Sequence, residues 1–253
     1  MARPLDGVPV KIDRAKTHLY DFEAHIRPIQ AACREAIVRE RDEQRSEYVF
    51  RLDHVPAVPA VLSAIIGDAI HNLRVSLDHL AWQLVIAKGG TPSDATTFPI
   101  LEVAPTPNRW GHTRPQINPG VPKELRKILD EVQPYKRAKP AHHELAILHR
   151  LDISDKHHEL LITVVGVRGL GWFGEVRPTA FNPGPYDDGD EICRFTFSDA
   201  HIENEFNPVI GFTVCLNEPA AGPWQESMGA ADLVRRSLRY IENEVLPRFG
   251  RFF

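Results

Sequence analysis

Histidine and aspartate are concentrated in two segments of this chain, residues 58–88 and 141–160, which hold seven of its twelve histidines. Imidazole is the side chain whose ordinary pKa lies nearest neutrality, so histidine can take up and return protons at physiological pH. A neighbouring carboxylate can orient the ring, and both groups can also bind zinc, iron or manganese. These two segments are therefore the best candidates for a polar site, and the rest of the chain must bring them together.

The first segment, residues 58–88, is predicted to be the long central helix of the fold. Its apolar residues recur at steps of three and four, which is the period of an amphipathic helix. Pro59 fits its start and Gly89-Gly90 fits its end. The face opposite the apolar stripe and its flank carry the following residues: Asp68, His71, Asn72, Ser76, Asp78, His79, Trp82 and Gln83.

The composition of this polar face leaves three interpretations open. The face is poor in lysine and glutamate, which are the usual solvent-facing residues, and rich in histidine, aspartate and asparagine. It is either a solvated surface, a buried network that fastens a second layer of structure, or a functional site.

The second segment, residues 141–160, carries an apolar stripe at Leu145, Leu148 and Leu151, which predicts another helix. Many polar residues surround that stripe. They are His142, His143, His149, Asp152, Asp155, Lys156, His157 and His158. We expect the turn at 152–158 to meet the central helix and complete one site with it.

The N-terminal part of the chain supplies the elements that hold these helices. Residues 10–27 have helical spacing, and Pro28 should end or kink that helix. Residues 34–54 fit either a continued helix or a β-hairpin with strands near 35–41 and 47–54. We favour the hairpin, because aromatic and branched residues alternate with other residues at Tyr48–Leu52.

Downstream, residues 89–121 are rich in proline, glycine, threonine and asparagine and predict a long covering loop, anchored by Phe98-Pro-Ile100 and Trp110. A short helix is expected at 122–132. Strands are expected at 160–167, 171–176, 191–197 and 208–216, with a loop at 178–190 and a turn at the glycine-rich run 169–174. A final helix is expected at 226–248.

This order of elements predicts an α+β fold. It consists of an N-terminal helical bundle with a long central helix and a β-hairpin, followed by a small antiparallel sheet and a C-terminal helix. We expect one domain over residues 1–253, with its helical part at about 10–160 and its sheet and final helix at about 160–253.

Composition excludes several classes of protein. The net charge is −4, which argues against a protein that coats nucleic acid, although a local basic groove remains compatible with it. Cys33, Cys193 and Cys215 are scattered and form no CxxC pair, so neither a disulfide framework nor a cysteine-based zinc site is indicated. No run approaches the roughly 18 apolar residues of a membrane span, and no apolar leader begins the chain. We therefore expect a cytoplasmic protein with no membrane partner.

Two phrases in these segments resemble the paired motifs of a known family. GDAIHNLRVSLDHLAWQL at 67–84 and LHRLDISDKHHELL at 148–161 are similar to motifs of a family of uncharacterised bacterial proteins. With the hairpin and Phe98-Pro-Ile100, the resemblance covers much of residues 10–162. It implies a bacterial source and no particular activity.

A second resemblance is to HEPN-type helical domains, many of which are metal-independent ribonucleases. Their motif is an arginine followed, after four to six residues, by a histidine, and Arg74 and His79 match it. This resemblance implies RNA as a partner, cleavage without a cofactor, and a homodimer.

RNA cleavage is accordingly the first function that we consider. It needs a base for the 2′-hydroxyl proton and cations for the phosphate, roles that His79 and Arg74 would take. The other catalytic candidates are Asn72, Asp78, Lys156 and His157, and the binding candidates are His71, Asp68, Trp82, Asp152 and Asp155.

Two alternatives stay open beside the nuclease. A metal-dependent hydrolase or oxygenase would use a divalent transition metal. Its ligands would come from His71, His79, Asp155, His157 and His158. This alternative is not favoured, because no HExxH motif is present and His71 and His79 are eight residues apart. A non-catalytic protein would instead use the polar residues as a structural core and bind a small molecule or another partner.

Overall fold

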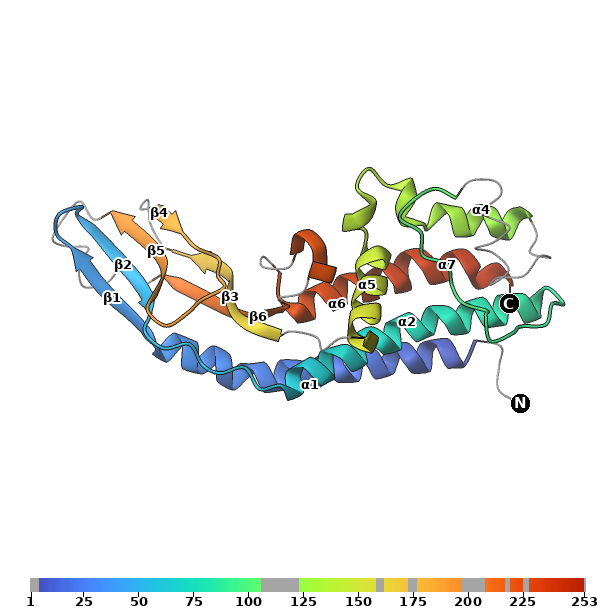
Figure 1. The fold of residues 1–253 in the computed structure, drawn as a ribbon, viewed down its shortest axis with the longest axis horizontal. Helices are drawn as coiled ribbons and strands as arrows, with labels where there is room; N and C mark the ends of the chain where they lie inside the picture. The colour runs from blue at the N-terminus through green and yellow to red at the C-terminus, as the bar shows by residue number, and fades with distance from the viewer. Residues whose placement is uncertain are drawn as a thin grey trace.

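The computed structural model describes residues 5–105, 123–157, 162–172, 177–196, 208–216, 219–224 and 228–252. The molecule is elongated, with its helices gathered toward one end and its strands at the other (Figure 1). This arrangement of long helices, a hairpin, small antiparallel sheets and a C-terminal helix confirms the predicted α+β fold.

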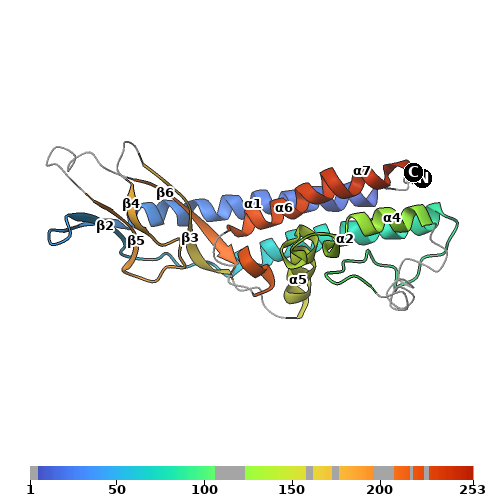
Figure 2. The same cartoon turned by 90° about the horizontal axis from the view of Figure 1, so that it is seen from above.

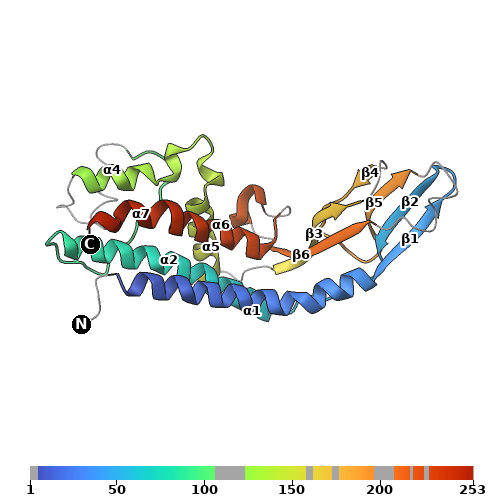
Figure 3. The ribbon, with the colours of Figure 1, turned by 180° about the vertical axis from the view of Figure 1, so that it is seen from behind.

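Helix α1, Gly7–Glu35, runs from the helical end to the strands (Figure 3). Its buried stripe continues past Pro28, with Ile29 and Cys33 in the core. Of the two expectations for Pro28, a helix end or a kink, the end near residue 27 was therefore wrong. The proline removes one backbone hydrogen bond, but burial of Ile29 and Cys33 on the same face keeps the following turns in place.

The β-hairpin predicted after this helix is confirmed. Strand β1, Ile37–Asp42, pairs antiparallel with β2, Glu47–Leu52. Ser46 closes the turn with a positive φ of 55°. The side chains of β2 are largely buried whereas those of β1 are largely exposed, so β2 is an inner strand and β1 an edge.

The remaining strands form two sheets. They are β3 (Ile162–Gly171), β4 (Pro178–Phe181), β5 (Asp190–Thr196) and β6 (Val209–Leu216). One sheet has the order β1-β2-β5-β4, and the other consists of β3 and β6. The hairpin thus joins the C-terminal strands through β2 and β5, which pair antiparallel.

Two expectations about these strands were wrong. The predicted loop at 178–190 contains β4, which begins at a proline; as an edge strand it tolerates the missing N–H. The glycine-rich run begins in β3 rather than in a turn, since Gly169 pairs with Gly211 and Gly171 with Val209 of β6. The expected strand at 171–176 lies mostly outside the described residues.

Helix α2, Val61–Ala87, is the predicted central helix. It lies beside α1 in two perpendicular views (Figures 1 and 2). Its middle is buried on most sides, since Asn72, Arg74 and Ser76 are buried together with the apolar stripe. A fully solvated polar face is therefore excluded for this part of the helix.

Shorter elements cover α2. Those that precede the sheets are α4 (Lys123–Glu131), the single turns η2 (Pro134–Lys136) and η3 (Pro140–His142), and α5 (Glu144–His157). Those at the end of the chain are η4 (Pro219–Trp224), α6 (Ala230–Tyr240), the π-helical η5 (Ile241–Val245), α7 (Leu246–Phe249) and η6 (Gly250–Phe252). The helices predicted at 122–132 and 226–248 are thus present, the second with an irregular middle.

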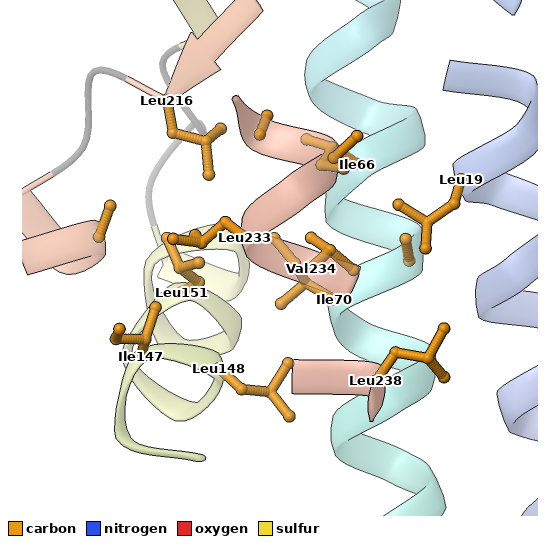
Figure 4. Packing of buried hydrophobic residues seen from close by; sticks show 14 of the residues in the cluster. Leu19, Ile66, Ile70, Ile147, Leu148, Leu151, Leu216, Leu233, Val234 and Leu238 are labelled. Atoms are coloured by element: carbon orange, nitrogen blue, oxygen red, sulfur yellow. The ribbon is translucent and has the colours of Figure 1, made fainter. Parts of the chain in front are cut away.

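The core beside the candidate site is formed where three of these helices meet. Figure 4 shows Leu148 and Leu151 of α5 close to Ile70 of α2 and Leu233 and Val234 of α6. All five side chains are buried. This apolar contact places the polar side of α5 beside α2.

Within the described parts of the chain, no helix combines the length and apolar character that a membrane crossing requires.

Candidate functional site

The polar residues of α2 and α5 meet in a cluster that we call the α2–α5 site, formed by Asp68, His71, Asp152, Asp155 and Lys156. Nδ1 of His71 lies 3.0 Å from Oδ1 of Asp152. The ammonium group of Lys156 donates to the other oxygen of Asp152 at 2.6 Å. The helix 58–88 and the segment 149–158 therefore do come together, as expected.

Burial differs sharply between these groups. Asp152 is only 2% exposed, whereas 44% of the His71 side chain is accessible to solvent. Asp152 follows Leu148 and Leu151 on the buried side of α5, one helical turn before Lys156. A buried carboxylate thus holds an accessible imidazole, and the lysine balances its charge.

Asp155 lies directly against the backbone of α2. A Cβ atom added to Gly67 would lie 2.4 Å from Oδ1 of Asp155, so the absence of a side chain at residue 67 permits the approach. Burial raises the pKa of Asp155, and the neighbouring carboxylates of Asp152 and Asp68 raise it further, while His71 and Lys156 oppose the shift. Asp155 therefore keeps its proton to a higher pH than an ordinary aspartate.

We predict that Gly67→Ala lowers the free energy of unfolding by about 1–3 kcal/mol, because the new methyl group overlaps the Asp155 carboxyl. Urea denaturation followed by circular dichroism measures the change. The double variant Gly67→Ala/Asp155→Ala should recover most of the lost unfolding free energy, since the second change removes the overlapping carboxyl atoms. A double variant as unstable as Gly67→Ala alone would contradict this cause.

A second group on α2 is formed by Arg74, Asp78 and the backbone of Phe98, and we call it the Arg74 clamp. Arg74 donates to Oδ1 of Asp78 at 2.6 Å and to the carbonyl oxygen of Phe98 at 3.0 Å. The N–H of Phe98 donates to the same Asp78 oxygen at 2.8 Å. Arg74 is 6% exposed and Phe98 is 1% exposed. The clamp therefore fixes the covering segment on α2, with Phe98 as the anchor that the sequence predicted.

His149 of α5 is close enough to both the α2–α5 site and the Arg74 clamp for charges of each to act on it. Burial lowers its pKa, and the nearby charges of Arg74, Asp152, Asp78 and Lys156 all act on it. Its Nδ1 atom is buried without a hydrogen-bond partner among the described residues. Burial therefore favours the neutral form of this imidazole.

A pocket of about 340 Å³ opens beside the C-terminal half of α2, and we call it the α2 pocket. It is lined by Asp78, His79, Trp82, Gln83 and Thr96. The ring of His79 also packs over Gly7 of α1, where an added Cβ would lie 2.6 Å from Nδ1. His79 therefore faces a different neighbour from His71, eight residues earlier on the same helix.

The other predicted site residues are placed as follows. Asn72 donates to the backbone oxygen of Asp68 within α2, and His157 is exposed at the end of α5. His158 lies outside the described residues. Among the residues described, no contact joins Arg74 to His79. The structure thus brings His71 together with the polar residues of α5. The Arg74 clamp and the α2 pocket form a second group on α2, and they share Asp78.

Four of the five residues expected as metal ligands, all but His158, lie in the described part of the chain, and they are not gathered into one metal site. Across the described ranges, no three or more histidine, cysteine, aspartate or glutamate side chains are arranged to hold a metal ion. His71 instead bonds Asp152, and His79 lies against Gly7.

Sequence reasoning missed Thr96, which lines the α2 pocket but belongs to no quoted motif. It gave no role to Gln83, which also lines the pocket and was noted only as a polar residue of the central helix. His149 was noted only as one polar residue of its helix. Its position seven residues before Lys156 and three before Asp152 would have placed it near the same face of α5, which is the signal that was available.

The fold and the site define an elongated α+β protein whose polar groups are arranged along one central helix. Comparison of the chain with protein-family models, curated proteins and solved structures finds no match.

Proposed function

We propose that the protein is an enzyme in which His71 acts as a general base and Asp152 orients it. The observation that carries this proposal is the contact between a buried carboxylate and a half-exposed imidazole, 3.0 Å apart. When the Nδ1–H group donates a hydrogen bond to Asp152, the lone pair of the other ring nitrogen, Nε2, is left to accept a proton from a substrate or water. The accessible part of the ring is therefore available for proton transfer.

Asp155 supports the same chemistry as a proton donor. Burial and the neighbouring carboxylates raise its pKa, so it keeps its proton to a higher pH than an ordinary aspartate does. A base and an acid whose environments differ in this way form the usual pair for acid–base catalysis. In the proposed reaction, His71 takes a proton from the attacking group and Asp155 returns one to the leaving group.

The charges of the site favour a neutral or cationic substrate. With Asp155 protonated as the acid, the charged groups that act on it include the two carboxylates of Asp152 and Asp68 and one ammonium group, that of Lys156, which pairs with Asp152. A phosphodiester is anionic and would be repelled by this set. Arg74, the expected phosphate ligand, already donates to Asp78 and Phe98. RNA cleavage is therefore the less supported substrate class within this proposal.

A structural role for the same contacts is the alternative. His71 and Lys156 both satisfy the buried Asp152, and this also fastens α5 onto α2. In that case replacement of His71 would change stability and no activity would depend on it.

The experiment is a comparison of hydrolysis rates for neutral and cationic nitrophenyl esters and anilides, with a fluorogenic RNA as the anionic member of the panel. We expect turnover of a neutral or cationic substrate, and a loss of about 100-fold in kcat/KM for His71→Ala. Asp152→Asn should lower the rate and alter its pH profile. His157→Ala, an exposed histidine on α5, is the matched control and should retain the activity.

Two results would count against the proposal. If His71→Ala turns over substrate as fast as the wild-type protein, His71 is not the base. If no member of the panel is turned over and His71→Ala only lowers the unfolding free energy, the structural alternative holds. Cleavage confined to the RNA would overturn the substrate class.

A further inference from the structure

The α2 pocket has the features of a recognition site for a flat ring, separate from the groups that transfer protons. We propose that it binds an uncharged planar heterocycle carrying N–H donors, stacked on Trp82. Its volume of about 340 Å³ is at the lower end of the roughly 300–1,000 Å³ typical of small-molecule pockets, which suits one or two fused rings.

Trp82 supplies the stacking surface. It is 39% exposed although it belongs to the central helix, and it borders the pocket. An indole face that remains accessible in a pocket stacks well on aromatic rings and heterocycles, because both surfaces are flat and polarisable.

Hydrogen-bond acceptors at the edge of the pocket select the ring. Both described hydrogen bonds to the Asp78 side chain go to Oδ1, from Arg74 and from the N–H of Phe98. Among the described residues no hydrogen bond reaches the second oxygen, Oδ2, which can therefore accept one on a carboxylate that the clamp holds in place. Gln83 adds an amide with one acceptor and two donor positions. Thr96 is 8% exposed, and its oxygen accepts from the N–H of Ser93, so its hydroxyl is positioned.

Charge argues for a neutral ligand. Arg74 pairs with Asp78 from beneath, at 2.6 Å, and balances its charge. None of the described lining residues is a lysine or an arginine, so this part of the lining offers no lysine or arginine cation to a phosphate or carboxylate. A ring that donates N–H bonds to Asp78 and Gln83 fits this set better than an anion does.

The pocket and His71 share one line along α2. One face of the helix carries His71, Asp78 and Trp82, because they are spaced seven and four residues apart along the chain. His71 and Asp78 are about 10 Å apart along the axis, at roughly 1.5 Å per residue. A substituent on the bound ring would extend toward His71. This orientation alone rests on the proposed function, whereas ring binding does not.

Calorimetric titration with adenine tests the proposal, and caffeine, a flat ring of similar size without N–H groups, is the comparison ligand. We expect saturable binding of adenine and binding of caffeine at least several-fold weaker. Trp82→Leu should weaken adenine binding about 10-fold, because the stacking surface is lost. The control is Trp172→Leu, since Trp172 is 37% exposed but packs on Phe195 at the sheets, and it should bind adenine as the wild type does.

The outcomes separate the two proposals. No saturable adenine binding, or equal affinity in Trp82→Leu, overturns the ring site. Equal affinity for caffeine overturns the role of the acceptors. His71→Ala should bind adenine normally, so a catalytically silent protein that binds adenine through Trp82 would refute the enzyme and keep the ring site. Circular dichroism of each variant checks that its fold is retained. We expect it to be retained in both tryptophan variants, because Trp82 and Trp172 are exposed and contribute little to the core.

Discussion

Replacing Arg74 by methionine is expected to lower the free energy of unfolding by about 3–5 kcal/mol. Methionine keeps much of the volume but supplies no donor, so the Asp78 carboxylate loses its cation and the Phe98 carbonyl its hydrogen bond. Only 7% of the Arg74 side chain is exposed, so little water can replace these bonds. Urea denaturation measures the loss.

Arg248 provides the matched control for this prediction. It pairs with Glu244 and Glu131, but 37% of its side chain is exposed. Arg248→Met should therefore change the unfolding free energy by less than about 1 kcal/mol, the usual value for a surface ion pair. If Arg74→Met has an effect as small as this, the clamp does not hold the covering segment on α2.

Acid should destabilise the protein through His143, by about 3 kcal/mol between pH 6.5 and pH 4. Burial lowers the pKa of His143 from its ordinary value of 6.5 to about 4, with Glu144 opposing and Arg137 adding to the shift. As pH falls, the unfolded chain binds the proton first, so stability is present above pH 6.5 and is lost down to pH 4, at roughly 1.4 kcal/mol per pKa unit.

The structure explains why this histidine stays neutral. His143 is 4% exposed and packs edge-to-face on Tyr240, with ring centroids 4.6 Å apart. Its Nδ1 accepts the N–H of Leu145 in the first turn of α5, at 3.1 Å. The proton therefore sits on Nε2, which is buried without a hydrogen-bond partner among the described residues. A second proton on Nδ1 would break the bond to Leu145.

His143→Asn isolates this effect. Asparagine is a good residue at the start of a helix, and its side-chain oxygen can accept the same N–H without titrating. The variant should lose about 3 kcal/mol less than the wild type between pH 6.5 and pH 4, measured by urea denaturation at each pH. His149, whose pKa is also lowered, remains in both proteins, so the comparison subtracts its contribution. Parallel pH curves for the two proteins would rule out His143 as the cause.

Local patterns in the sequence were enough to predict most of the fold. The stripe of α2 and the alternation in β2 depend on residues that are close along the chain, and both predictions are confirmed. The rule that proline ends a helix failed at Pro28, because the packing of Ile29 and Cys33 outweighs one lost hydrogen bond. Strand β4 was missed because its pairing with β5 is not visible in its own short sequence.

The candidate site was predictable only as two segments that meet. The contact of His71 with Asp152 joins residues 81 positions apart, and it depends on how α5 is rotated against α2. The sequence singled out His79 instead, which the structure places over Gly7 and in the α2 pocket. The angle at which two helices pack decides which polar residues on them meet. The helical period of the sequence shows only which residues share a face of one helix.

The pairing of β2 with β5 has a consequence for synthesis of the chain on the ribosome. Residues 47–52 emerge early, but their partner, residues 190–196, is made more than half a chain later. Until then β2 has only β1 beside it, and the side chains of Tyr48, Val49 and Phe50, which are buried in the finished protein, lack their cover. An open strand edge of this kind is prone to pair with other chains. The hairpin can therefore complete its pairing only after β5 has been made, although it is made before the central helix.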